Sequence, residues 1–354
     1  MFITAEYIWL DGNQPTQTLR SKTRIVPSAD GARPDAADLP RWSFDGSSTH
    51  QASGGDSDLL LEPVAVVRDP IRGKGHFLVM TEVLNPDGTP HSTNQRARLA
   101  QVLAAGASEQ GPWIGFEQEY TLFDGSRPLG WPEGGYPAPQ GPFYCGVGAG
   151  RVFGRSLVEV HGAACLDAGL MLYGINAEVM PGQWEFQVGY RGVAGETADP
   201  LTVSDHLWMS RWLLQRLGED MGIGVSFENK PVKGDWNGAG AHTNFSTRAM
   251  REDGGVAAIE DASGRLGSRH GEHIAAYGAD LDERLTGLHE TCSIGEFRGG
   301  VADRGASIRI PRHVAEQGRG YLEDRRPGAN CDPYLVSRML LQTVCQPALE
   351  ARVA

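Results

Sequence analysis

The first quarter of the chain consists of short runs in which apolar and polar side chains alternate. Alternation with a period of two is typical of half-buried strands. One run ends in the turn-forming pair Asp11-Gly12, and another is closed by a turn at residues 85–88. We therefore expect a small, sheet-rich domain over residues 1–90, with strands at Glu6–Leu10, Leu19–Val26 and His76–Val83 and a polar loop at Ser28–Leu39.

The remainder of the chain mixes helical periodicity with further strands. Apolar residues three and four positions apart predict helices, and capping residues mark where they begin and end. We expect a larger α+β domain over residues 91–354. Three helices are predicted first: from Ser92 or Thr93 to Ala105, over Arg151–Ala168 before Gly169, and over Asp205–Gly218 with Ser204 or Asp205 as cap. A long helical region ending near Tyr277 and a helix over Pro333–Val344 follow. Strands are predicted over Trp113–Phe123, on both sides of Met180-Pro181-Gly182 within Ile175–Val188, and over 240–246.

Composition and charge narrow the class of protein. The chain of 354 residues is long enough to bury a sizeable core, and its 40% apolar content is ordinary for a globular protein. It contains no run of about 20 apolar residues and no basic, apolar leader. A net charge of -12 without Lys/Arg-rich blocks argues against nucleic acid binding. Five cysteines without CxxC spacing favour reduced thiols, which are typical of the cytoplasm, so we expect a cytoplasmic protein. From the charge and the apolar runs, we expect neither nucleic acid nor membrane as partner.

Two glutamates, Glu117 and Glu119, stand two positions apart in a predicted strand. Both carboxylates therefore face one side of the strand, and Gln118 faces the other. Two such charges about 4 Å apart repel by about 4 kcal/mol at an effective dielectric constant near 20, and a divalent cation would offset this repulsion. A solvent-facing edge strand would explain the same pattern, and for this motif alone it is the simpler interpretation.

The segment INAEVMPGQWEFQVG adds Glu178 and Glu185, each surrounded by apolar residues. A buried glutamate is rarely tolerated without a partner, and few basic residues are near in sequence. His242 follows a glycine-rich stretch and shares a strand face with Asn244; a lone histidine is more often a core or surface residue. Four carboxylates and one imidazole on separate strands nevertheless favour an oxygen-rich site for Mg²⁺ or Mn²⁺ over a zinc site.

Arginines gather in the last third of the chain, with Glu323 among them. Guanidinium groups bind carboxylates and phosphates in a fork, although for any single arginine a surface ion pair is the simpler interpretation. The sequence has no P-loop, no nucleophile elbow and no cysteine with an adjacent histidine. The arginines in question are Arg284, Arg304, Arg309, Arg325 and Arg326.

Longer segments of the chain resemble glutamine synthetase in its shorter, eukaryote-like type II form. The matching segments stand in family order over nearly the whole chain: FDGSST (44–49), GFEQEYTLF (115–123), NAEVMPGQWEFQVG (176–189), KGDWNGAGAHTNFST (233–247), RLTGLHET (284–291), RGASIRIPR (304–312) and GYLEDRRPGANCDP (320–333). The resemblance implies a β-grasp-like N-terminal domain and a catalytic domain whose curved antiparallel sheet forms a funnel flanked by helices. It also implies a homo-oligomer, commonly a decamer of two stacked pentameric rings, with active sites between the domains of neighbouring subunits.

The resemblance further implies an activity. Ammonia would be joined to the γ-carboxylate of L-glutamate through a γ-glutamyl phosphate, with ATP as co-substrate and two or three Mg²⁺ or Mn²⁺ ions per active site. One ion would be held by Glu119, Glu178 and Glu185 and another by Glu117, His242 and Glu323.

The remaining site residues are also implied by the resemblance. The nucleotide would contact Trp113, Glu185, Asn244, Ser246, Arg304, Arg309 and Tyr321. The other substrates would contact Asp58, Trp236, Asn237, Gly238, Arg284, Glu290, Arg304 and Arg325. Asp45 of a neighbouring subunit would deprotonate ammonium, Glu290 would close the glutamate entrance, and Arg304 and Arg325 would act in phosphoryl transfer.

Two stretches depart from the family pattern and leave the acceptor open. Tyr190–Pro200 is longer than expected beside the nucleotide mouth, and Cys292–Gly300 borders the acceptor end. Alternatives are γ-glutamylation of another amine, a catalytically silent ring-forming relative and, from the residues alone, a two-metal hydrolase. The presence of Asp45 favours ammonia, and the presence of all the metal and arginine positions argues against a silent protein.

Overall fold

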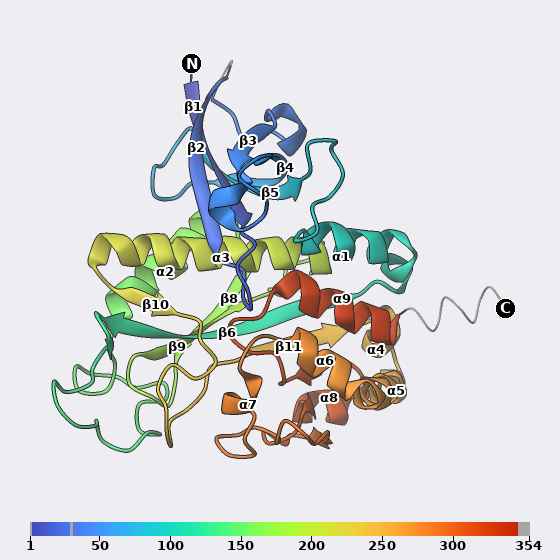
Figure 1. Ribbon diagram of the computed structural model, residues 1–354. Coiled ribbons are helices and arrows are strands. Elements are labelled where there is room, and N and C mark those ends of the chain that lie inside the picture. The colour runs from blue at the N-terminus through green and yellow to red at the C-terminus, as the bar shows by residue number, and fades with distance from the viewer. Residues whose placement is uncertain (1, 29–30, 346–354) are drawn as a thin grey trace.

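The structure is a computed structural model that describes residues 2–28 and 31–345 (Figure 1). Its N-terminal part is a five-stranded sheet in the order β2-β1-β5-β4-β3. Neighbouring strands are antiparallel except β1 and β5, which are parallel. The elements are β1 (Phe2–Leu10), β2 (Leu19–Pro27), β3 (Trp42–Asp45), β4 (Asp58–Arg68) and β5 (His76–Leu84), with 3-10 turns η1 (Ala36–Asp38) and η2 (Gly46–Thr49).

A second, nine-stranded sheet forms the body of the molecule, in the order β12-β13-β14-β11-β6-β9-β8, with β7 and β10 also paired to β6. Its pairs are antiparallel except β12 with β13. The strands are β6 (Trp113–Asp124), β7 (Arg127–Pro128), β8 (Leu172–Ala177), β9 (Gln183–Val188), β10 (Gly224–Ser226), β11 (Ala241–Ser246), β12 (Gly299–Val301), β13 (Ile308–Ile310) and β14 (Leu322–Asp324).

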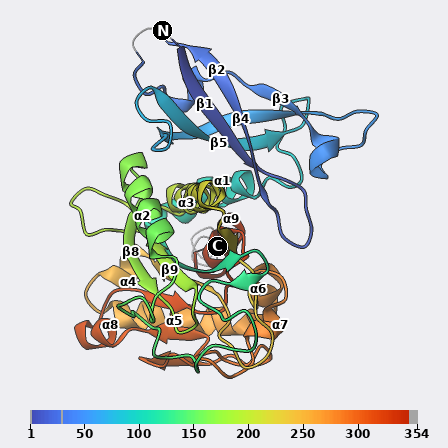
Figure 2. The same cartoon turned by 90° about the vertical axis from the view of Figure 1, so that its left-hand side faces the viewer.

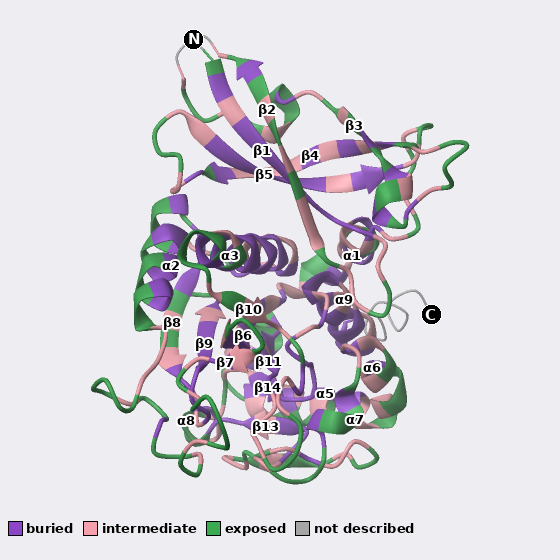
Figure 3. Cartoon of the chain, turned by 60° about the vertical axis from the view of Figure 1, so that its left-hand side comes forward, coloured by how far each residue is buried: buried purple, intermediate pink, exposed green. Residues whose placement is uncertain are grey.

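Helices α1, α3 and α9 lie between the N-terminal sheet and the rest of the molecule, whereas α4 to α8 lie around the second sheet (Figure 2). Helix α9 packs against α1, α3 and α5, and α2 packs against α3. The long α3 and the apolar α9 are largely buried (Figure 3). The helices are α1 (Gln95–Ala104), η3 (Ala107–Gln110), α2 (Arg155–Ala168), α3 (Pro200–Met221), α4 (Arg248–Arg251), α5 (Gly255–Ser268), α6 (His270–Ala276), α7 (Leu281–Arg284), α8 (Arg312–Gln317) and α9 (Pro333–Val344).

Strand β1 shows why the N-terminal sheet stays attached to the helices. Ile3 and Tyr7 belong to the core of the N-terminal part, whereas Ile8 and Leu10 belong to the larger core below it. Successive side chains of a strand point to opposite faces, so one apolar strand serves two cores. Burial of these side chains contributes about 1.5–3 kcal/mol each.

A partly buried ion-pair cluster reinforces the same junction. Arg96 of α1 donates to Glu82 of β5 at 2.8 Å and to Asp205 of α3 at 2.8 and 2.9 Å. Asp205 also accepts from the Tyr334 hydroxyl of α9 at 2.6 Å. Elements α1, β5 and α3 therefore meet at one guanidinium group, and α9 joins the cluster through Asp205.

The α+β architecture with a small N-terminal sheet is confirmed, but the second sheet is mixed rather than wholly antiparallel, because β12 and β13 are parallel, and several predicted boundaries are wrong. Helix α1 is capped by Asn94, whose side chain accepts from the amide of Ala97, rather than by Ser92 or Thr93. Helix α3 begins at Pro200, after Asp199 as cap, instead of near residue 205. Helix α2 begins at 155 rather than 151, and the long helical region ending near 277 is divided into α4, α5 and α6. Strands β3 and β4 were not predicted individually.

Candidate active site

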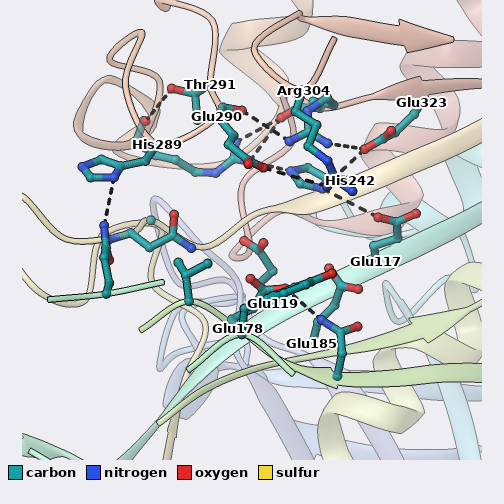
Figure 4. A pocket seen from close by; sticks show the side chains of 18 of the residues that line it. Glu117, Glu119, Glu178, Glu185, His242, His289, Glu290, Thr291, Arg304 and Glu323 are labelled. Atoms are coloured by element: carbon teal, nitrogen blue, oxygen red, sulfur yellow. Dashed lines mark hydrogen bonds and ion pairs between the residues drawn. The ribbon is translucent and has the colours of Figure 1, made fainter. Parts of the chain in front are cut away.

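A cavity of about 690 Å³ lies over the second sheet (Figure 4). Strands β6, β8, β9, β11, β13 and β14 supply its floor, and loops supply most of its rim. Among the residues that line it are Glu117, Glu119, Glu178, Glu185, Asn237, Gly238, His242, Arg284, Glu290, Arg304, Arg309, Glu323 and Arg325.

The register of the sheet brings the acidic side chains together. Glu119 of β6 stands directly opposite Glu185 of β9, and Glu117 stands opposite His242 of β11. Glu323 of β14 is opposite Asn244 of β11, so the row continues to the next strand. Because residues two apart on a strand share a face, these neighbouring strands present one polar surface to the cavity.

The reverse face of β6 explains the residue between the two glutamates. Gln118 is fully buried, and its side-chain oxygen accepts from Nε of Arg211 on α3 at 2.9 Å. Its amide nitrogen donates to the carbonyl oxygens of Glu119 and Ala329. The sequence Glu-Gln-Glu therefore has one face for the cavity and one for the helices, as predicted from strand geometry.

Burial and mutual repulsion govern the charges on these groups. Burial, followed by the charges of Glu117 and Glu119, raises the pKa of Glu185 to about 9, and burial with the charge of Glu119 raises the pKa of Glu178 to about 8. Burial raises the pKa of Glu119 and lowers the pKa of His242 well below its ordinary value. A bound cation would oppose the proton on all these groups, since it stabilises ionised carboxylates and a neutral imidazole.

Two groups of side chains have the spacing of metal ligands. One comprises Glu117, His242 and Glu323 and the other Glu119, Glu185 and His242, and within each group the candidate ligand atoms lie within 4.8 Å of one another. His242 Nδ1 lies 3.7 Å from Glu117 Oε2 and 3.6 Å from Glu323 Oε1. Carboxylates with one imidazole fit Mg²⁺ or Mn²⁺. Glu178 lines the same cavity but is outside both groups.

Arginines from the C-terminal third surround Glu323. Arg309 and Arg325 each donate to one of its carboxylate oxygens at 2.5 Å. Arg284 is buried, which lowers its pKa to about 10, and its Nη2 lies 3.0 Å from Nε2 of His242. Arg304 is exposed at the rim, with Nη1 3.9 Å from Oε2 of Glu290. Fixed cations beside the carboxylates suit a negatively charged substrate.

An apolar cavity of about 330 Å³ adjoins the strands on the side of Asn244. The ring of Trp113 lies 4.6 Å from that of Tyr190, between ring centroids, and the guanidinium of Arg251 lies 4.2 Å from the Trp113 ring. Arg251 also donates to the Ser246 hydroxyl at 2.8 Å. Tyr321 completes this wall, so four residues assigned to the nucleotide by resemblance lie together: Trp113, Asn244, Ser246 and Tyr321.

Three predicted residues line neither of these two cavities. Asp45 and Asp58 are exposed in the N-terminal sheet, where they face each other across β3 and β4. Hydrogen bonds from Ser47 and Ser48 lower the pKa of Asp45 to about 2. Trp236 packs on Trp131, with ring centroids 4.6 Å apart, and is absent from the cavity lining that the described residues form.

Amide side chains in the cavity were missed. Asn176 donates to Glu178 at 2.9 Å and Gln187 donates to Glu185 at 2.6 Å. Asn244, which was predicted, donates in the same way to Glu117 at 2.8 Å. Asn176 and Gln187 each stand two residues from the glutamate they contact, so strand periodicity contains the signal. Gln140 and His289 also line the cavity but come from long loops, where no periodicity places them.

The fold and the two cavities define a class: an α+β enzyme whose acidic, arginine-framed site suits divalent metal ions and anionic substrates. Comparison with known protein families identifies the family within this class. Residues 2–86 match the family described as glutamine synthetase, beta-Grasp domain, and residues 92–276 match the glutamine synthetase catalytic domain. The chain belongs to the glutamine synthetase family.

Individual relatives agree over nearly full length. The chain is 56% identical to a glutamine synthetase of Streptomyces viridochromogenes, with 99% of this chain and 98% of the relative covered. It is 55% identical to glutamine synthetases of Suillus bovinus (96% and 93% covered) and Chlamydomonas reinhardtii (chloroplastic; 97% and 90% covered).

A solved structure shares the fold. It is titled as a GmaS/ADP complex and matches with a TM-score of 0.71 at 22% identity, covering 98% of this chain and 79% of that one. Within the described part of the chain, no helix is both long and apolar enough to cross a membrane.

Proposed function

We propose that this protein joins ammonia to the γ-carboxylate of L-glutamate at the expense of ATP, forming L-glutamine, ADP and phosphate. One observation carries the proposal: in a chain of this family, adjacent strands bring Glu117, Glu119, Glu185, His242 and Glu323 onto one face, next to arginines. Phosphoryl transfer to a carboxylate needs metal-binding acidic residues and arginines side by side, and this cavity has both.

The acidic residues would hold two or three Mg²⁺ or Mn²⁺ ions. We assign one ion to Glu119, Glu178 and Glu185 and another to Glu117, His242 and Glu323. The raised pKa values of Glu178 and Glu185 support this assignment, because a site built for a cation is poorly stable without one. The bound ions would supply positive charge to the phosphates of ATP.

ATP would lie across both cavities. Its base fits the aromatic cavity with Trp113, Asn244, Ser246 and Tyr321, and its phosphates would extend toward Arg309 and Glu185. Arg251, which contacts both Trp113 and Ser246, is an additional nucleotide-side residue. Glutamate would occupy the other end of the acidic cavity, between Arg284, Arg304 and the segment Trp236–Gly238.

The reaction then proceeds in two steps. An oxygen of the γ-carboxylate attacks the γ-phosphorus, the bond to the β-phosphate oxygen breaks, and Arg304 and Arg325 stabilise the charge on the transferring group. Ammonia next attacks the carbonyl carbon of the γ-glutamyl phosphate, and phosphate leaves. Glu290, on the loop above the cavity, would limit access of water to this intermediate.

Asp45 and Asp58 require a second copy of the chain to reach a site. Both are exposed on strands β3 and β4 of the N-terminal sheet, whereas the residues that line the acidic cavity lie between Glu117 and Arg325. We infer a homo-oligomer, a decamer of two stacked five-membered rings, in which Asp45 faces the neighbour's cavity. Its low pKa keeps it anionic at neutral pH, which attracts ammonium and favours loss of its proton. The five free thiols favour a cytoplasmic location.

The test is phosphate release from ATP by purified protein with Mg²⁺ and glutamate, with ammonium and, separately, with small primary amines in its place. The proposal predicts that ammonium stimulates release and that glutamine forms in equal amount. Stimulation by another amine alone would keep the acyl phosphate chemistry and change the acceptor. Absence of release with every acceptor would reject the proposal.

A further inference from the structure

The loop that carries Glu290 is closed at its base and reaches across the cavity at its tip. Thr286 and Ser293 form an isolated bridge at the base. On one side of the tip, the Glu290 carbonyl oxygen accepts from Arg325 Nη2 at 3.3 Å. Its carboxylate faces Arg304, so both contacts of Glu290 are to the C-terminal third of the chain.

His289 provides the contacts to the opposite wall (Figure 4). Its Nε2 lies 2.8 Å from Oδ1 of Asp235, which belongs to the loop between β10 and β11. Its Nδ1 lies 3.0 Å from the side-chain nitrogen of Gln140, in the loop between β7 and α2. Gln140 in turn accepts from the backbone amide of Asn237 at 2.8 Å.

This chain of contacts fixes the direction of every hydrogen bond. The amide of Asn237 can only donate, so the Gln140 atom facing it is the oxygen and the Gln140 nitrogen faces His289. That nitrogen donates, so Nδ1 of His289 accepts and the imidazole proton is on Nε2. The Asp235 carboxylate accepts this proton, and donors and acceptors match at all three contacts.

The backbone at the tip is strained in a way that needs such support. His289 has φ of 51° and Glu290 has φ of 59°, two successive non-glycine residues in the left-handed region. Each such residue costs free energy and persists only where the surroundings hold it. The bonds of His289 to one wall and of Glu290 to the other hold this conformation.

We propose that His289 is a positioning residue that holds Glu290 over the cavity and, through Gln140, ties the loop to the segment that contacts glutamate. Asn237 and Gly238 of that segment line the same cavity. Binding of glutamate at this segment and closure of the loop that carries Glu290 are thereby coupled. This inference deepens the proposed function and rests on it where it concerns the γ-glutamyl phosphate.

The test compares His289→Ala with His289→Asn and Asp235→Asn. His289→Ala removes both bonds, and we expect about a tenfold loss of kcat/KM for glutamate together with more than one phosphate released per glutamine at limiting ammonium. His289→Asn keeps an acceptor at the Nδ1 position, and Asp235→Asn keeps an acceptor for Nε2, so both should lie closer to the wild type. Asp253→Ala is the matched control for loss of an exposed ion pair. The side chain of Asp253 is as exposed as that of Asp235 (94% and 91%), and within the described part of the chain its ion pair is with Arg319 alone.

The phosphate-to-glutamine ratio distinguishes positioning from a general structural defect. A less stable protein loses both products in proportion, whereas an open loop admits water and raises the ratio. If His289→Ala has the wild-type ratio and kcat/KM, or loses activity at an unchanged ratio, the inference is wrong.

Hydrogen exchange of residues 286–293 separates this inference from the proposed function. We expect exchange about fivefold faster in His289→Ala than in the wild type and in Asp253→Ala, whatever reaction the protein catalyses. Equal exchange would overturn the inference even if glutamine is formed. Faster exchange in a protein that forms no glutamine would leave the link intact and reject the function.

Discussion

Glu178 shows most clearly how unfavourable an ionised carboxylate is in the cavity when no cation is bound. The residue is 8% exposed, and its carboxylate has a pKa raised to about 8 and accepts a hydrogen bond from Asn176. A carboxylate in this setting destabilises the ion-free protein, because burial and the charge of Glu119 oppose its ionisation. Such a residue indicates a site that gains its stability on binding a cation.

Replacement of Glu178 should separate activity from folding. In Glu178→Ala we expect metal-dependent activity to fall roughly 100-fold or more, equivalent to about 3 kcal/mol of lost transition-state stabilisation. The urea midpoint should stay the same or rise, since a repelled carboxylate is removed. Mn²⁺ titration and urea unfolding measure the two effects, and full activity in the variant would refute the metal assignment.

Asp45 gives a second prediction at this scale. If it acts on ammonium, Asp45→Ala should slow glutamine formation about tenfold more than it slows formation of the acyl phosphate, since only the second step involves ammonium. The acyl phosphate is measured by trapping it with hydroxylamine. Equal losses in the two steps would count against the assignment.

At the scale of elements, the strand register is what converts scattered motifs into a site. The strand over 113–123 and the two strands around Met180 are predictable from alternation, and so is the shared face of Glu117 and Glu119. The three-residue strands β12, β13 and β14 are too short for any periodicity to identify. The place of Glu323 beside His242 therefore follows from resemblance rather than from pattern.

The contact between α2 and α3 predicts a pH dependence of stability. His161 is fully buried beside the Ser210 carbonyl, and burial lowers its pKa to about 4. Because the unfolded chain binds a proton at this residue near pH 6.5 and the folded chain does so only near pH 4, its stabilising contribution is complete above pH 6.5. That contribution, about 3 kcal/mol, is lost as the pH falls from 6.5 to 4.

His161→Gln keeps a donor for the Ser210 carbonyl but does not titrate in this range. We expect its urea unfolding free energy to fall less steeply than that of the wild type between pH 6.5 and 4.5. His273, whose pKa is also lowered to about 4 by burial, should keep part of the slope in both proteins. Identical slopes in the two proteins would show that His161 does not contribute.

At the scale of the whole molecule, the attachment of the N-terminal domain decides where Asp45 is presented. The packing of β1 into two cores and the cluster around Arg96 both fix this attachment. Sequence patterns predict the two domains but not this junction, because Glu82, Arg96 and Asp205 are far apart in the chain and carry no common motif. The predicted start of α3 is wrong for a local reason: Asp199 is the cap and Pro200 the first residue of the helix, whereas both are predicted to lie within the departing stretch Tyr190–Pro200.

Arg96→Met should therefore weaken the whole molecule. It leaves the buried carboxylate of Asp205 and the half-buried carboxylate of Glu82 without a cation, and removing one partner of a buried ion pair costs about 3–5 kcal/mol. Arg98→Met is the matched control on the same helix, because Arg98 is exposed and donates to a surface carbonyl. Urea unfolding measures both variants, and a loss below about 1 kcal/mol in Arg96→Met, or equal losses in the two, would contradict the role of the cluster.

The central claim is that one site joins ammonia to glutamate through an intermediate made from ATP. Its most direct test is incubation of purified protein with glutamate, ATP, Mg²⁺ and isotopically labelled ammonium, followed by mass spectrometry of the products. The account predicts that the label enters the side-chain amide of glutamine, with one ADP formed for each labelled molecule. ADP formation without labelled glutamine, or labelled glutamine without ADP, would contradict it.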